Sequence, residues 1–268
     1  MNQILNQPDF DLDIIYRELL TVVHRAYVFM RFGHRGISLS DFDETRLPGS
    51  LQIMVVPEPM PAEVLKEYTE QYKSWVLGNG VRDLVEAFAH FLDGIYEIGL
   101  ALTSSPDPAR KLRKCEAASL RSKVQLLKAE FQIEGVFAQH FDTFTAARNA
   151  LAHGRGVVRK KHCNVDDALV ITWQGLDDRF LATDGNRYEP NGRPEGIEFV
   201  EPLDQERPLR EKCWKIGERV ELSARDLAEI TFMANYEAVD VTDAFCEFAM
   251  AQGVTLKPVT IIRGGSAE

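Results

Sequence analysis

The chain has 268 residues, of which 45% are hydrophobic and 27% are charged, and its formal net charge is −10 at pH 7. This composition is typical of a globular protein and excludes collagen-like, disulfide-scaffold and disordered chains. The acidic balance disfavours general binding to polyanions or to an anionic membrane surface. Any nucleic-acid site therefore has to be a local basic patch.

No segment of the sequence predicts export or membrane insertion. The start, MNQILNQP, lacks the basic stretch followed by an apolar stretch that a signal peptide requires. The most apolar stretch, 12–32, contains five charged residues and a histidine, so we expect a buried helix rather than a membrane span. The four cysteines are far apart with no C-x-x-C pair, which argues against a zinc site or a disulfide framework. We expect a cytoplasmic protein without membrane contact.

The first half of the chain is predicted to be largely helical. Its expected elements are a helix over 12–32, a strand over 51–56, and helices over 62–77 and 81–102. Asp9 or Asp11 can cap the first helix, and Gly33 is expected to end it. The sequence Gly-Asn-Gly at 78–80 predicts a break or a bend between the last two helices.

The second half mixes helices with short β-branched segments. Its expected elements are helices over 109–131 and 136–153, strands over 168–173, 179–182 and 196–200, a helix from Ser223 to about 251, and a strand over 259–262. Ser223 and Asp226 form a variant of the capping box at the start of the last long helix. We therefore expect one α+β domain over 1–268, mainly α, with a small antiparallel β-meander as a β-rich insertion over 155–222.

The predicted helix over 136–153 has a charge on its apolar face. At 100° per residue, one stripe of this helix consists of Phe137, Phe141, Phe144 and Leu151. Arg148 falls in the middle of that stripe, where a permanent charge needs a partner or contact with water. A second, polar stripe consists of Asp142, Thr145, Asn149 and His153. At the end of a helix, the backbone dipole favours the protonated form of a histidine.

An arginine and a histidine so placed are the minimum for cleaving RNA without a metal. The 2′-hydroxyl has to lose a proton, the leaving 5′-oxygen has to gain one, and the charge of the phosphorane has to be stabilised. One chain offers a single such histidine, so a two-fold homodimer that brings two copies of Arg148 and His153 together would serve both proton transfers. We expect the phenylalanine stripe to form the dimer surface.

The segment Arg148-Asn-Ala-Leu-Ala-His153, followed by Gly154, resembles the Arg-x(4–6)-His motif of HEPN proteins. The resemblance implies a HEPN-like helical core over 62–160 and a metal-independent endoribonuclease, with no cofactor. It also implies RNA as substrate, a homodimer and an antitoxin-like protein partner. By this resemblance Arg148 and His153 are the catalytic residues, with Arg148 on the scissile phosphate, and Asn149 supports them.

Local charge favours RNA as a ligand. Residues 146–162 contain five basic residues and no acidic one, and the expected RNA-binding residues there are Arg155, Arg159, Lys160 and Lys161. Residues 105–131 add seven basic residues against three acidic ones. Two neighbouring helices are thus predicted to carry basic patches.

Each of these residues has a structural interpretation as well. Arg148 can form an ion pair with an acid of the helix over 81–102, and the candidates are Asp83, Glu86 and Asp93. His153 can simply cap carbonyl groups at the end of its helix. The alternative function is a non-catalytic HEPN-like interaction module or nucleotide-binding module.

A cysteine and two tryptophans are further candidates for a functional role. Cys163 follows His162 and is a candidate thiol nucleophile, although most isolated cysteines are only small apolar residues. Trp173 and Trp214 can stack on a base, although core packing is the usual role of such residues. The spacing of the histidines predicts no metal site.

Overall fold

The computed structural model describes residues 12–35, 61–135, 138–154, 156–188, 199–206 and 208–254. The strands predicted over 51–56 and 259–262 lie outside the described residues, as do the caps Asp9 and Asp11. The helices are α1 (Leu12–Arg35), α2 (Ala62–Leu102), α3 (Pro108–Glu116), α4 (Leu120–Phe131), α5 (Ala138–Gly154) and α6 (Ala224–Ala251), with a short 3₁₀ turn, η2 (Lys160–His162).

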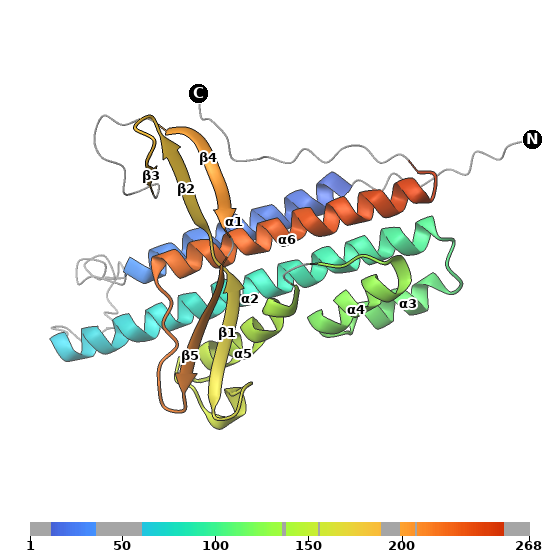
Figure 1. The fold of residues 1–268 in the computed structure, drawn as a ribbon. Coiled ribbons are helices and arrows are strands. Elements are labelled where there is room, and N and C mark those ends of the chain that lie inside the picture. Colours follow the sequence, from blue (N-terminus) through green and yellow to red (C-terminus); the bar gives the residue numbers. More distant parts are fainter. Residues whose placement is uncertain are drawn as a thin grey trace, which may run out of the picture.

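The long helix α2 is the centre of the helical bundle, because it contacts α1, α3, α4, α5 and α6. Figure 1 shows α1, α2 and α6 running side by side, with α3, α4 and α5 on the other side of α2. The bundle therefore extends beyond the core predicted over 62–160, because it also includes α1, which precedes these residues in the sequence, and α6, which follows them. The prediction of a mainly helical chain with a small antiparallel β part before the last helix is confirmed.

The expected helix break at 78–80 is wrong, because α2 continues through it. A Cβ atom at Gly78 would lie 3.0 Å from Cβ of Leu151 on α5, and one at Gly80 would lie 2.3 Å from Cγ of Met30 on α1. These glycines allow two helices to approach α2 closely instead of ending it. Gly33, expected to end the first helix, is likewise buried within α1, which extends to Arg35.

The helix predicted over 109–131 is two helices. α3 begins at Pro108 and is capped by Asp107, whose side chain accepts a hydrogen bond from the amide of Arg110. α4 begins after Ser119, whose hydroxyl accepts from the amide of Ser122. A serine able to cap a new helix, three residues after the end of α3, explains the interruption.

The β-rich part is a long antiparallel ribbon rather than a meander. Its strands are β1 (Ala168–Gln174), β2 (Asp177–Ala182), β3 (Arg187–Tyr188), β4 (Phe199–Glu206) and β5 (Leu209–Lys215). β1 pairs with β5 and β2 pairs with β4, while β3 adds to the other edge of β2. The amide of Gly175 donates to the carbonyl of Pro208 and links the two paired regions. Figure 1 shows the ribbon running past the helices.

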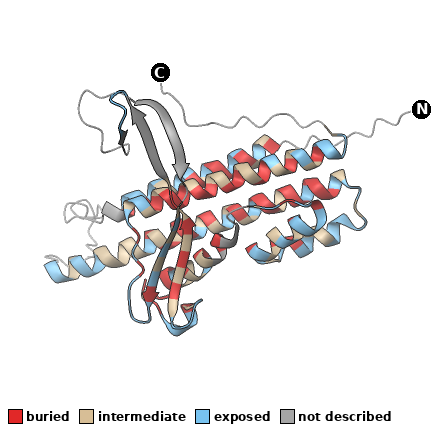
Figure 2. Cartoon of the chain, viewed as in Figure 1, coloured by how far each residue is buried: buried red, intermediate tan, exposed pale blue. Residues whose placement is uncertain are grey.

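The core joins the helices to the first strand of the ribbon. Figure 2 shows buried residues along the facing sides of α1, α2 and α6 and along β1. The hydroxyl of Tyr16 on α1 donates to Asn235 on α6 at 3.0 Å. Nδ1 of His140 on α5 lies 2.7 Å from the hydroxyl of Thr172 on β1, and burial lowers the pKa of this histidine. These contacts fix α6 against α1, and β1 against α5, the helix that carries the motif.

Candidate functional site

Arg148 lies on α5 beside α2, with 31% of its side chain exposed. Its Nη1 donates to Oδ1 of Asn149 at 2.9 Å, and its Nη2 lies 3.6 Å from Oε1 of Glu86. Glu86 is thus the acid that contacts Arg148, whereas Asp83 and Asp93 contact other cations. The structural interpretation of Arg148 is correct as far as the ion pair goes, but the guanidinium is not sealed from solvent.

Glu86 is a shared carboxylate at the protein surface. Nε of Arg82, one turn earlier in α2, lies 3.2 Å from Oε1 of Glu86, and 47% of the Glu86 side chain is exposed. Solvent screens such ion pairs strongly, so they contribute little to stability. An anionic ligand can therefore compete with Glu86 for the guanidinium of Arg148.

The C-terminal half of α5 packs antiparallel to α2, so that later residues of α5 meet earlier residues of α2. Arg148 contacts Glu86, Leu151 packs on Gly78, and a Cβ at Gly156 would lie 2.7 Å from Oγ of Ser74. The end of the motif therefore lies at the level of residues 74–78 of α2. The side chain of His153 and the whole of Arg155 fall outside the described part of the chain.

A stripe of exposed and half-buried side chains on α2 leads toward the ion pair. We name it the α2 stripe, and its members are Trp75, Asn79, Arg82 and Glu86. Their spacings of four, three and four residues place them on one face of the helix. The sequence-based prediction missed this stripe, because it ended one helix before 78–80 and began another after it. A single helix over 62–102 would have revealed the spacing.

The phenylalanine stripe is not a dimer surface. Phe141, Phe144 and Leu151 are each 2% exposed, and the ring of Phe141 stacks on Phe88 of α2 with centroids 4.3 Å apart. The chain's own bundle covers these side chains, so the dimer surface predicted there is wrong. Phe137 lies outside the described residues.

Three of the predicted RNA-binding residues are exposed beside the end of α5. Arg159, Lys160 and Lys161 are all exposed, and η2 packs against α5. Nδ1 of His162 accepts from the amide of Arg159, and Sγ of Cys163 donates to the carbonyl of Arg159. Both side chains hold the backbone of this turn, and His162 is buried, which assigns them a structural role rather than that of a nucleophile and its base.

The basic patch predicted over 105–131 is largely compensated. Lys111 pairs with Glu130 at 2.8 Å, and Lys128 pairs with Glu134. Lys123 is 3% exposed and is held inside the protein. These three cations are engaged within the chain, so this segment is a weaker candidate for an RNA surface than the end of α5.

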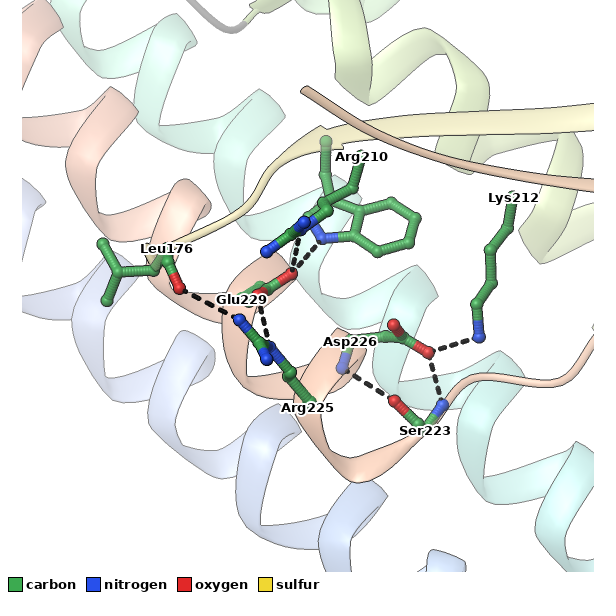
Figure 3. A network of polar contacts seen from close by, with 8 residues as sticks. Leu176, Arg210, Lys212, Ser223, Arg225, Asp226 and Glu229 are labelled. Carbon is green, nitrogen blue, oxygen red and sulfur yellow. Dashed lines mark hydrogen bonds and ion pairs between the residues drawn. The ribbon is translucent and has the colours of Figure 1, made fainter. Parts of the chain in front are cut away.

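Trp173 and Trp214 are core residues, 2% and 8% exposed, so the alternative of base stacking is wrong for both. Nε1 of Trp173 donates to Glu229 of α6 at 2.9 Å. Figure 3 shows that Arg210 and Arg225 also approach the carboxylate of Glu229. This network ties β1 and β5 to the first turns of α6.

A cavity of about 400 Å³ lies between the end of α1, the first half of α2 and the segment before α6. Its basic side chains are Lys73, Lys212 and Arg219, and Glu70 and Glu221 also line it. Lys73 lies 3.4 Å from Glu70, and Lys212 is paired with Asp226. Most of its charges are thus balanced locally, and Arg148 is not among its lining residues.

The described residues hold no group of three or more histidine, cysteine or acidic side chains suited to a metal ion. All four cysteines are free. None of the helices in the described part of the chain combines the length and apolar character of a membrane span. Comparison of the chain with protein-family models, curated proteins and solved structures found no match. The geometry around Arg148 is therefore the basis for assigning a function.

Proposed function

We propose that the protein is a metal-independent endoribonuclease of the HEPN type, with Arg148 and His153 as its catalytic residues. The observation that carries this proposal is the position of Arg148. Its guanidinium reaches the surface beside α2, is oriented by the side chain of Asn149, and pairs with the exposed carboxylate of Glu86. A site for a phosphate requires such a cation, close to solvent and preset in direction.

The chemistry follows from these residues. The 2′-oxygen of the RNA attacks phosphorus and loses its proton to a base, while Arg148 stabilises the negative charge on the phosphorane. The bond from phosphorus to the 5′-oxygen breaks, and an acid protonates that oxygen. The products are a 2′,3′-cyclic phosphate and a free 5′-hydroxyl. His153 serves as the base or the acid, and exposed Arg159, Lys160 and Lys161 hold the flanking phosphates.

A second copy of the chain supplies the second proton-transfer group in this proposal. Because the phenylalanine stripe is buried, the surface available to bring two copies of Arg148 together is the exposed one formed by α5 and the α2 stripe. An antitoxin-like partner that covers the same surface would block the reaction. Light scattering of the wild type measures whether it forms the required dimer.

The first test is cleavage of an end-labelled, structured RNA in EDTA by the wild type and by His153→Ala. We expect the variant to be slower by at least about 100-fold, the usual contribution of a general acid or base. His24→Ala is the matched control, because His24 is an exposed histidine on α1, and it should cleave like the wild type. Equal cleavage by all three proteins would reveal a contaminating nuclease.

One observation favours the alternative of a non-catalytic HEPN-like interaction module. Arg148 has a carboxylate partner within its own chain, as a structural arginine does. In that case the wild type does not cleave RNA, and the exposed surface around Arg148 serves contact with another molecule. The absence of cleavage in every RNA tested would favour this alternative.

A further inference from the structure

The exposure of Trp75 is the feature of the α2 stripe that the catalytic proposal leaves unexplained. The chain has three tryptophans, all in the described part. Trp173 and Trp214 are 2% and 8% exposed, whereas Trp75 is 66% exposed. Tyr68, seven residues earlier on the same face of α2, is 43% exposed. Large aromatic rings in water at one end of a charged stripe indicate a binding surface.

The position of Trp75 relates it to the motif. It lies eleven residues before Glu86 on α2, which corresponds to about 16 Å along a helix axis. The end of α5 packs on the turn of α2 that contains Trp75, since Gly78 meets Leu151 and Gly156 meets Ser74. An RNA strand with its phosphate at Arg148 can therefore reach Trp75 within a few nucleotides.

The residues of this surface match what single-stranded nucleic acids need. Single strands are held by cations that follow the backbone and by aromatic rings on which bases stack. Arg82 and Arg148 supply the cations, and Trp75 supplies the largest aromatic face available to a protein. A paired helix keeps its bases stacked inside, so only unpaired nucleotides can use such a ring.

We infer that Trp75 is a stacking platform for an unpaired base of the RNA bound at Arg148, which makes single-stranded segments the substrate class. This inference rests on the proposed ribonuclease function. It assigns Trp75 a role in binding and specificity, since an indole ring stacks on a base but supplies neither a charge nor a proton-transfer group for the reaction.

The test uses the intrinsic fluorescence of the full chain. Because the other two tryptophans are buried, quenching by added RNA reports on Trp75. His153→Ala protein, which leaves the RNA intact, is titrated with a short single-stranded oligouridine and with a duplex RNA of equal length. We expect saturable quenching by the single strand and none by the duplex.

Variants then separate stacking from other effects. In otherwise wild-type protein, Trp75→Ala should raise KM for single-stranded RNA by about 5- to 150-fold with little change in kcat, the range expected for loss of one stacked base. Trp75→Phe should restore most of the affinity, because it keeps an aromatic face. Met250→Ala, which removes an equally exposed apolar side chain at the end of α6, should leave KM unchanged.

The outcomes distinguish the two proposals. Cleavage by the wild type with an unchanged KM in Trp75→Ala would overturn the stacking role and leave the ribonuclease function standing. The absence of cleavage by the wild type would overturn the ribonuclease function itself. If Trp75 becomes shielded from acrylamide as protein concentration rises, and RNA causes no quenching, the ring is a contact between copies and the stacking role is overturned.

Discussion

Two ion pairs on the same helix, α2, have opposite surroundings. Asp93 pairs with Lys123 of α4, and the two side chains are 15% and 4% exposed. Glu86 pairs with Arg148 of α5, and these side chains are 47% and 31% exposed. In both pairs a carboxylate of α2 meets a cation from a later helix. Burial is what separates them.

The buried pair is completed by the backbone. Nζ of Lys123 also donates to the carbonyls of Cys115 at 2.9 Å and Glu116 at 3.3 Å, so all three of its protons have acceptors. This ammonium joins the end of α3, α4 and α2 at one point. Burial, together with Asp93, raises the pKa of the Cys115 thiol to about 12 and keeps it unreactive. A cation satisfied in this way is not available to a ligand.

Among the described residues the exposed pair has no such backbone acceptors, and its carboxylate is divided between Arg148 and Arg82. The comparison teaches that the charge alone does not identify a functional arginine or lysine. Both cations appear in basic segments of the sequence, but only the one at the surface, loosely held, can exchange its partner for a phosphate.

The largest effect is expected from breaking the buried pair. Lys123→Ala leaves the Asp93 carboxylate and two backbone carbonyls without their donor, so the free energy of unfolding should fall by about 3–5 kcal/mol. Urea unfolding followed by circular dichroism measures it. A loss below about 1 kcal/mol would show that the buried pair is as dispensable as the exposed one.

A pair of intermediate exposure, Lys212 with Asp226, should give an intermediate effect. Burial raises the pKa of Asp226, but hydrogen bonds from Lys212 and from Ser223 outweigh it and lower the pKa below its ordinary value. Since the carboxylate also caps α6, Asp226→Asn should cost about 1–2 kcal/mol at pH 7.

The pH dependence of this effect has a defined sign. Because the folded protein holds the Asp226 pKa below its unfolded value, the stabilisation is complete above the unfolded pKa of about 3.9. It is lost as the pH falls through the lower pKa of the folded state. Measured between pH 7 and pH 3, the free energies of unfolding of wild type and Asp226→Asn should therefore differ by a constant amount down to about pH 4 and draw closer below it. A constant difference over that range would contradict the assignment.

The smallest effect is expected for the exposed pair. Glu86→Gln should change the free energy of unfolding by less than about 1 kcal/mol, and the difference should shrink in high salt. Binding of RNA to this variant should be equal to or tighter than wild-type binding, because Arg148 loses its competing carboxylate. Weaker RNA binding by Glu86→Gln would contradict this competition, and would show that Arg148 depends on its ion pair with Glu86.

Local signals in the sequence predicted much of the secondary structure. The capping box of Ser223 and Asp226 begins α6 as expected, with the serine hydroxyl accepting from the Asp226 amide at 3.1 Å. The β-branched run over 168–173 predicted β1, whose side chains alternate between buried and half-buried in the structure. Such signals depend on a few neighbouring residues, so they can be recognised without knowing what packs against them.

The misinterpreted segments are those whose role depends on distant residues. The glycines at 78–80 are read locally as a break, but their partners, Leu151 and Met30, come from other helices. Because α2 is continuous, Trp75 and Glu86 lie on one face of the same helix. The proposed binding surface rests on that observation. A predicted boundary within α2 thus concealed part of the candidate site.

The sequence by itself determined the acidic balance, the mainly helical character, the cap of α6 and the presence of Arg148 within an apolar stripe. Only the tertiary structure decided that Phe141 and Phe144 face the core, and that Arg148 meets Glu86 at the surface. Periodicity fixes which residues share a face of a helix, but it does not state which face another helix covers. That choice follows from the packing of whole elements, which buries some cations with all their acceptors and leaves others open to a ligand.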